Sequence, residues 1–241
     1  MISPSEITVR RLRLRAGHRT LLALDDARLP IEKPLLVIHA PSGTGKSLLF
    51  RALCGYVPRG LAGEVDVALG SNDEAVYASA LHRETFHVSR NFRYVAQSSA
   101  NTFSPFRSLR RQMLDVRRTD GPRPEEIAGP LGVARLLADD VYSYEISTGQ
   151  TQRLAFVRAV CSGGRVLFCD EITSGLDPDN EARMLDACRQ AVADLGLRFV
   201  ISSHRPVEGV DVEVCTLSPT TIVPIAKDAG PRPVAGQEIG S

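Results

Sequence analysis

One-sided hydrophobic patterns mark two segments of the chain as strands. In ITVRRLRLR, residues 7–15, apolar Ile7, Val9, Leu12 and Leu14 stand between polar residues. Such alternation is typical of a strand with one buried face. The segment GEVDVALG, residues 63–70, has a similar pattern. We expect these segments to be half-buried strands of an antiparallel sheet, because such sheets can leave one face in water.

Continuous apolar runs mark a second kind of strand. The runs are PLLVIH (34–39), RVLFCD (165–170) and RFVISSH (198–204). Runs of this type predict strands that are buried on both faces, as in parallel sheets.

A helical pattern lies between two of these runs. In DNEARMLDACRQAVADLG, residues 179–196, the side chains of Leu185, Cys188, Val192 and Leu195 fall on one helical face. Gly196 can end this helix. Strands that alternate with helices indicate an α/β fold with a mostly parallel sheet.

The middle of the chain, about residues 98–147, is less regular and reads as a small helical insert. Its segment RSLRRQMLDVRRTDGPRP, residues 107–124, holds six Arg and two Asp. This charge favours either a solvated face or a docking surface for a partner, whereas nucleic-acid binding would call for interleaved aromatic residues. We expect one domain over residues 1–224 and a mobile tail over 225–241, which is rich in Pro, Gly and charge.

Composition narrows the class of protein. The 241 residues are 43% hydrophobic and carry a net charge of +1, so overall charge points to neither nucleic acid nor a membrane surface. No apolar run approaches the roughly 20 residues of a membrane span, and no secretory signal opens the chain. The five cysteines have no C-x-x-C spacing, which predicts buried thiols in a reducing cytosol: Cys54, Cys161, Cys169, Cys188 and Cys215.

The segment APSGTGKS, residues 40–47, has the order of residues that a phosphate-binding loop needs. Its glycines let consecutive backbone N–H groups surround an anion, and the following helix points its positive end there. We expect Lys46 to reach the β- and γ-phosphates and Ser47 to ligate Mg²⁺. The predicted nucleotide contacts here are Ala40, Pro41, Ser42, Gly43, Thr44, Gly45, Lys46, Ser47 and Leu48.

Two positions depart from the usual form of this loop. Ala40 replaces a Gly, which is acceptable if its φ is negative. Leu48 lacks the hydroxyl that could touch the α-phosphate, and this predicts weaker binding.

Two carboxylates follow the apolar run at residues 165–170. Asp170 and Glu171 stand where that strand ends, at the edge where parallel sheets bind ligands. Asp170 could hold Mg²⁺ through water, and Glu171 could polarise the attacking water.

Together with YEISTGQTQRLAFVRAV, residues 144–160, these segments strongly resemble the ATP-binding-cassette (ABC) ATPases. The resemblance assigns the signature motif to Ile146–Gln150, the D-loop to Ser174–Asp177, the Q-loop glutamine to Gln97 and the switch histidine to His204. It implies a P-loop NTPase with a RecA-like core, an antiparallel β subdomain and the inserted α-helical subdomain. It also implies ATP and Mg²⁺ as cofactors.

The resemblance also implies roles for single residues. Glu171 and His204 would be catalytic, and the metal would be held by Ser47, Gln97 and Asp170. Further ATP contacts would come from Gln97 and from Ser147, Thr148, Gly149, Gln150 and Asp177. Because the signature helix makes a second anion site, two subunits would sandwich ATP head to tail, as a homo- or heterodimer. We expect this helix to run from Thr151 to Val160.

Three departures from the family pattern matter. Thr148 and Ile172 replace a Gly and a Pro, and only His18 stands where an adenine-stacking aromatic is expected. The missing ring predicts loose discrimination between ATP and GTP.

The segments AQSSANTFSPFRSLRRQM and YSYEIS resemble the peptide/nickel importer branch of the family. The resulting hypothesis is an ATPase subunit that powers a membrane importer, held on the inner face of the membrane by integral membrane subunits. The alternative is an ATPase in a non-transport assembly such as a carbon–phosphorus lyase-like complex. No direct nucleic-acid contact is expected, and the transported substrate would depend on partner subunits.

Overall fold

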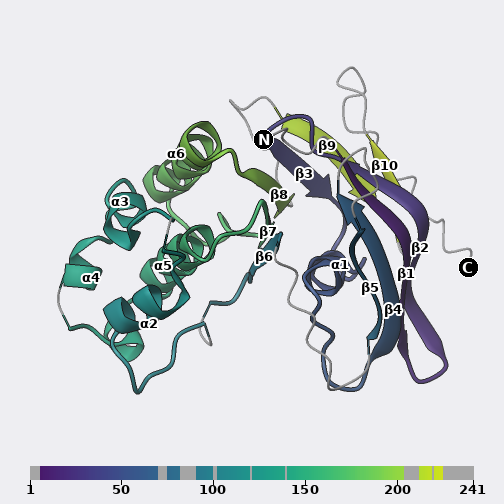
Figure 1. Ribbon diagram of the computed structural model, residues 1–241, viewed down its shortest axis with the longest axis horizontal. Helices are drawn as coiled ribbons and strands as arrows, with labels where there is room; N and C mark the ends of the chain where they lie inside the picture. Colours follow the sequence, from purple (N-terminus) through teal and green to yellow (C-terminus); the bar gives the residue numbers. More distant parts are fainter. Residues whose placement is uncertain are drawn as a thin grey trace, which may run out of the picture.

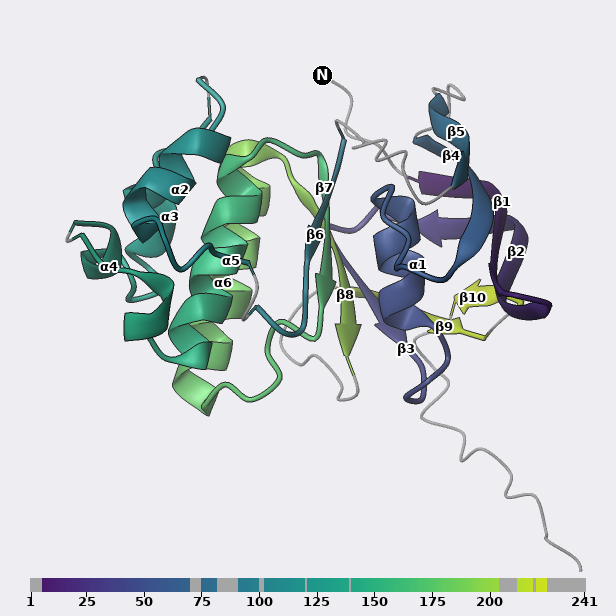
Figure 2. The ribbon, with the colours of Figure 1, turned by 90° about the horizontal axis from the view of Figure 1, so that it is seen from below.

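Two β-sheets, one helix between them and a group of helices on the far side form successive layers. The computed structural model describes residues 6–69, 75–81, 91–99, 102–119, 121–138, 140–203, 212–218 and 220–224. Helix α1 (Lys46–Leu53) lies between a four-stranded and a six-stranded sheet (Figure 1). Figure 2 shows the other long helices, α5 (Thr148–Cys161) and α6 (Pro178–Leu195), on the far face of the six-stranded sheet.

The four-stranded sheet is the predicted antiparallel subdomain. Its order is β2 (Arg19–Pro30), β1 (Glu6–Ala16), β4 (Ala62–Leu69) and β5 (Ala75–Leu81). The two strands expected from alternation are direct neighbours, with Leu12 opposite Val65. The hydrophobic alternation of β1 skips one residue between Val9 and Leu12, and the register with β4 shifts there, so both Arg10 and Arg11 lie on the outer face.

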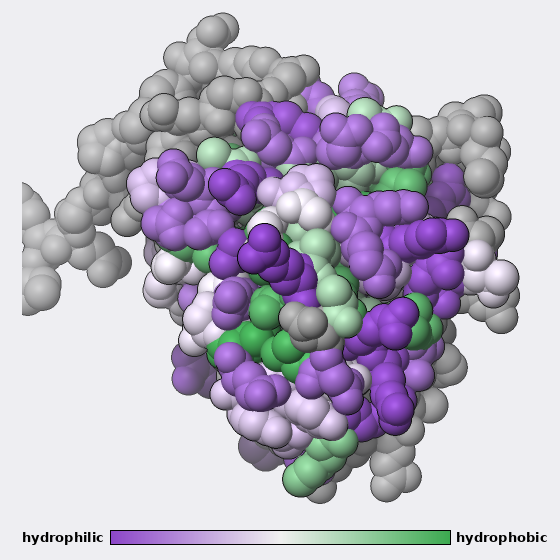
Figure 3. Space-filling model, turned by 90° about the vertical axis from the view of Figure 1, so that its left-hand side faces the viewer, coloured by the Kyte–Doolittle hydropathy of each residue, from purple (hydrophilic) through white to green (hydrophobic). Residues whose placement is uncertain are grey.

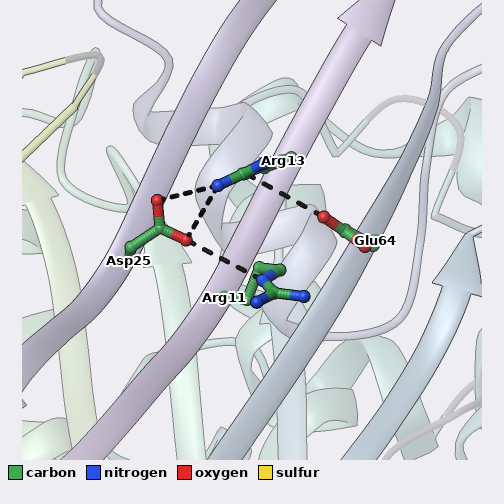
Figure 4. A network of polar contacts seen from close by, with 4 residues as sticks. All are labelled: Arg11, Arg13, Asp25 and Glu64. Carbon is green, nitrogen blue, oxygen red and sulfur yellow. Dashed lines mark hydrogen bonds and ion pairs between the residues drawn. The ribbon is translucent and has the colours of Figure 1, made fainter.

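Ion pairs cross the solvent face of this sheet (Figure 4). Arg13 on β1 contacts Asp25 on β2 at 3.1 Å and Glu64 on β4 at 3.9 Å. Arg11 lies 3.9 Å from the same Asp25. These side chains are 40–57% exposed, so solvent screens the pairs and each contributes little to stability.

The six-stranded sheet is the predicted parallel core. Its order is β10 (Ile222–Pro224), β9 (Val212–Leu217), β3 (Leu35–His39), β8 (Arg198–Ser203), β7 (Val166–Asp170) and β6 (Phe92–Val95). Neighbouring strands pair in parallel except β9 with β10. The predicted P-loop NTPase α/β fold is confirmed.

The apolar strands fill two cores at once. On β7, Val166 and Phe168 pack toward α1 and the antiparallel sheet, whereas Leu167 and Cys169 pack toward α5 and α6. The ring of Phe168 meets Phe50 of α1 at 5.3 Å between centroids. Because both faces are covered, a continuous apolar run forms this strand, as predicted.

The insert between β6 and α5 is helical, as predicted. It holds α2 (Leu109–Val116), α3 (Pro124–Ala128), α4 (Arg135–Ala138) and a 3₁₀ turn at Ser143–Glu145. The end of the molecule that carries these helices is mostly hydrophilic, with a small apolar area near its centre (Figure 3). None of the helices in the described ranges has both the length and the apolar character of a membrane span.

Helix α6 corrects one sequence prediction. Of the predicted face, Cys188 is buried and Val192 packs against the core, as expected, whereas Leu195 is 38% exposed. The other buried residues are Met184, Ala187 and Ala191, which the prediction missed. Gly196 ends the helix with a φ of 66°, as predicted.

The cysteines are free, as predicted. Cys161, Cys169, Cys188 and Cys215 are buried and Cys54 is partly buried. The domain limits and the tail stay predictions, since residues 225–241 lie outside the described ranges.

Candidate functional site

The phosphate loop connects the buried strand β3 to α1. Gly45 caps the helix with a φ of 99°, and Gly43 has a φ of 81°. Side chains other than glycine rarely adopt this left-handed region, so the two glycines give the loop its curvature. Ala40 is outside the positive-φ region, which confirms the expectation for that position.

Lys46 is folded back onto this loop. Its Nζ donates to the carbonyl of Ala40 at 2.5 Å and to the carbonyl of Pro41 at 3.2 Å. The residue is 6% exposed. Burial lowers the pKa of Lys46, and the negative charges of Glu171 and Asp170 partly oppose this shift. The two acids therefore help to keep the ammonium group charged beside the loop.

One open cleft of about 470 Å³ joins the loop to two residues that lie far along the sequence. The sequence predicted every residue of its lining as a site residue: Ser42, Gly43, Gly45, Lys46, Ser47, Leu48, Gln97 and Glu171. Thr44, also predicted, stiffens the loop by donating from its hydroxyl to the Pro41 carbonyl at 2.7 Å.

Asp170 ends β7 beneath this cleft and is 1% exposed. Its Oδ1 accepts a hydrogen bond from Ser202 Oγ at 2.7 Å, and its Oδ2 accepts from the Tyr94 hydroxyl at 3.0 Å. Each carboxylate oxygen has room for a further bond, so the group can still accept from a metal-bound water.

Glu171 turns out of the strand into the cleft. Its φ of 50° is one of two positive values among the described residues that are not glycine. Its Oε2 accepts a hydrogen bond from Gln97 Nε2 at 2.8 Å. The structure thus brings together the acid and the glutamine that the sequence placed 74 positions apart.

The signature segment forms the start of α5. Ser147 caps the helix: its Oγ accepts from the backbone N–H of Gln150 at 3.2 Å, and Gln150 Oε1 accepts from the N–H of Ser147 at 2.8 Å. The helix therefore begins at Thr148, not at Thr151 as predicted, because this capping box nucleates it earlier. Ser147 and Thr148 are exposed, and the helix N-terminus is open to an anion.

Asp177 caps α6. Its carboxylate accepts from the backbone N–H of Asn180 at 2.9 Å and from the Asn180 amide at 2.6 Å. These hydrogen bonds lower the pKa of Asp177. His204 lies outside the described residues, so its role stays a prediction.

The residues present fit a nucleoside triphosphate with Mg²⁺. The loop offers left-handed glycines and a buried ammonium group, and Ser47, Gln97 and Asp170 offer hydroxyl, amide and carboxylate oxygens, the ligands that Mg²⁺ prefers. Within the described ranges no group of three or more His, Cys, Asp or Glu could hold a metal alone.

Sequence reasoning missed the residues that support the two acids. They are Arg51, Tyr94, Gln152 and Ser202. Gln152 is 4% exposed, and its amide donates to the carbonyls of Ile172 at 2.8 Å and Glu171 at 3.3 Å. For two of them the sequence offered a signal, a hydroxyl group within a mostly apolar strand: Tyr94 in FRYV and Ser202 in FVISS.

Comparison with solved structures supports the fold. The structure of cbiO1 from Clostridium perfringens, part of the ABC transporter complex cbiONQ, superposes with a TM-score of 0.67 at 19% identity, over 90% of this chain and 86% of that chain. A bacterial Atm1-family ABC exporter with ATP bound gives a TM-score of 0.68 at 20% identity, over 92% of this chain and 38% of that chain.

Curated relatives are methionine import ATP-binding proteins called MetN. The protein from Ralstonia nicotianae is 34% identical over 193 residues, which cover 79% of this chain and 54% of that protein. The protein from Photobacterium profundum is 28% identical over 216 residues, 86% of this chain and 60% of that protein. The chain thus spans little more than half the length of these relatives. They do not support the predicted peptide/nickel branch.

A family model described as ABC transporter matches residues 24–174, more than half of the chain. This match runs from β2 through the phosphate loop, Gln97 and the signature segment to the two acids. The resemblance inferred from the motifs is confirmed: the chain belongs to the ABC transporter family.

Proposed function

We propose that this chain binds ATP with Mg²⁺ in the phosphate-loop cleft, hydrolyses it, and so powers a membrane importer. The observation that carries the proposal is the meeting of Gln97 and Glu171 at 2.8 Å within a cleft otherwise lined by the phosphate loop. This arrangement places a carboxylate beside the anion site.

Binding rests on the loop and on Lys46. The backbone N–H groups between Ser42 and Ser47 surround the phosphates, and the helix dipole of α1 adds a positive field. The ammonium group of Lys46 exchanges its bonds to the Ala40 and Pro41 carbonyls for bonds to phosphate oxygens, which are stronger because both partners are charged.

Hydrolysis rests on Glu171. Its carboxylate orients the attacking water and draws on its proton. Mg²⁺, when bound, neutralises charge that develops on the phosphate oxygens. Because Glu171 Oε2 now accepts from Gln97, a shift of the Gln97 loop frees the carboxylate for water and links hydrolysis to movement of the helical insert.

The second half of the site comes from another subunit. Helices α1 and α5 pack on opposite faces of the six-stranded sheet (Figure 2). The start of α5, at exposed Ser147 and half-buried Gly149, then meets the nucleotide of a partner ATPase subunit, with Asp177 at the contact between the two.

A groove beside β6 suits a helix from the membrane subunit. It measures about 400 Å³ and lies among Tyr94–Ala96, α2 and α5, with Arg93 and Arg158 in its lining. Exposed Arg110 and Arg111 extend the positive charge on α2. An acidic helix end in this groove holds the chain at the inner face of the membrane. The named activity of the relatives points to import of an amino acid such as methionine, with selection made by the partner subunits.

Glu171→Gln tests the hydrolytic role. The variant should bind MgATP normally but lose about a hundredfold or more in kcat, because an amide cannot act as a general base. Steady-state ATPase assays and calorimetry measure the two effects. Asp186→Asn, the same chemical change on exposed α6, should leave kcat unchanged. Wild-type turnover in Glu171→Gln would refute the role of this residue.

Charge reversal on α2 tests the importer. With its native neighbours co-expressed, Arg110→Glu/Arg111→Glu should lower membrane recovery, whereas MgATP binding should not change. Asp186→Lys/Asp194→Lys, which alters exposed charge farther along α6, is the matched control for recovery. A wild-type chain found only with a soluble enzyme assembly would refute transport.

A further inference from the structure

Beneath the phosphate-loop cleft, two chains of hydrogen bonds end on one carboxylate. In the first, Arg51 Nε donates to the Tyr94 hydroxyl at 3.3 Å, and that hydroxyl donates to Asp170 Oδ2 at 3.0 Å. In the second, the backbone N–H of Glu171 donates to Ser202 Oγ at 3.0 Å, and Ser202 donates to Asp170 Oδ1 at 2.7 Å. Each hydroxyl accepts one bond and donates another, so the two bonds polarise each other.

These bonds tie together the elements that form the cleft. Arg51 is on α1, which follows the phosphate loop, and Tyr94 is on β6, which leads to Gln97. Ser202 is on β8, directly opposite Asp170 in the parallel register. The guanidinium of Arg51 also lies over the ring of Tyr94, 5.7 Å from its centroid.

Burial makes these donors necessary. Asp170 and Ser202 are each 1% exposed, and a buried carboxylate needs donors in place of the water it has lost. With one donor on each oxygen, the carboxylate plane is fixed, and the lone pair that remains on each oxygen has a defined direction.

The second chain also supports the backbone of Glu171. A φ of 50° is strained for a residue with a Cβ. Ser202 accepts the N–H of this residue, and Gln152 donates to its carbonyl. The peptide units on both sides of the Glu171 Cα are thereby held, which keeps the side chain directed into the cleft.

We propose that Tyr94 and Ser202 are positioning residues for the ATPase site: they orient the Asp170 carboxylate toward the metal and keep Glu171 in its left-handed conformation. The inference rests on the proposed function. Neither hydroxyl needs to touch the nucleotide, because Tyr94 acts through Asp170, and Ser202 acts through Asp170 and Glu171.

Tyr94→Phe and Ser202→Ala each remove one hydroxyl with little change of shape. We expect kcat to fall about 10- to 100-fold, the usual cost of losing a group that orients a metal ligand, while ATP binding in EDTA stays as in the wild type. The loss should be larger for Ser202→Ala, which also leaves the N–H of Glu171 without this acceptor. Ser108→Ala is the control, since Ser108 is 3% exposed and lies in the helical insert.

A second readout does not depend on turnover. Thermal unfolding with ATP in EDTA and with MgATP gives the part of the stabilisation that requires the metal. Both variants should keep the rise in Tm with ATP alone and lose much of the additional rise with Mg²⁺, and Ser108→Ala should lose neither. Tyr94→Phe decides the matter if Ser202→Ala does not fold.

The outcomes separate this inference from the proposed function. Wild-type kcat and a wild-type metal-dependent rise in Tm for both variants would overturn it. The inference would also be overturned if the variants lost the rise in Tm with ATP alone as fully as the additional rise with Mg²⁺, because that result indicates general damage to the nucleotide site. If the wild type itself does not hydrolyse ATP, the proposed function fails, and the metal-dependent rise in Tm still decides the role of the two hydroxyls.

Discussion

Replacement of Gly45 by alanine tests whether the backbone of the phosphate loop forms the anion site. Gly45 has a φ of 99° at the cap of α1, and a Cβ there would meet only Leu22 Cδ1, at 3.8 Å, an ordinary contact. The cost of Gly45→Ala is therefore backbone strain, about 1–2 kcal/mol for a left-handed residue with a Cβ. For a domain of this size, about 2–4 °C in Tm per kcal/mol gives a fall of about 2–8 °C.

The same change should weaken nucleotide binding by more than this strain suggests. An alanine that relaxes toward negative φ turns the neighbouring N–H groups away from the phosphates. Loss of one hydrogen bond to a charged group costs about 1.5–3 kcal/mol, which corresponds to a Kd for MgATP raised about 10- to 150-fold. Calorimetric titration with MgATP measures this directly.

Gly196→Ala is the matched control. Gly196 has a φ of 66° at the end of α6, with no atom within 4 Å of its built Cβ. The Gly196→Ala variant should lose a similar amount of stability as Gly45→Ala, and its affinity for MgATP should not change. Wild-type affinity in Gly45→Ala would show that the loop geometry does not form the nucleotide site. Equal losses of affinity in both variants would show that reduced stability alone is the cause.

Two further predictions concern stability. Arg13→Ala should lower the free energy of unfolding by at most about 1 kcal/mol, because its partners are solvent-exposed. Leu12→Ala, at the fully buried position next to it, should lower it by about 2–5 kcal/mol in denaturant unfolding. Similar losses in the two variants would contradict this account of the sheet. Burial lowers the pKa of Lys46 in the folded state, so the unfolded state binds the proton of this side chain more tightly. The free energy of unfolding of the wild type, relative to that of Lys46→Met, should therefore rise as the pH approaches 10.5. A difference between the two proteins that does not change with pH would contradict this prediction.

The local hydrophobic pattern was sufficient to predict strands that have either both faces buried or one face buried and one exposed. The strand at Val166–Asp170 is apolar throughout because both of its faces are covered, and alternation identified Glu6–Ala16 because one of its faces is open. The loop at residues 40–47 was also predictable, since its glycines are required by its own backbone angles. Pattern was less informative for Pro178–Leu195, where it identified buried Cys188 but missed Ala187 and Ala191, because alanine gives a weak hydrophobic signal.

The amino-acid sequence by itself determined strands β1, β3, β4, β7 and β8, helix α6, the phosphate loop, and the two acids and the glutamine of the site. These follow from hydrophobic period, from glycine geometry and from motifs a few residues long. Only the tertiary structure decided which polar groups support the acids, because the bonds of Asp170 to Tyr94 and Ser202 span 76 and 32 positions. They exist because β6, β7 and β8 pair in one register, and a shift of one residue would turn each side chain to the opposite face.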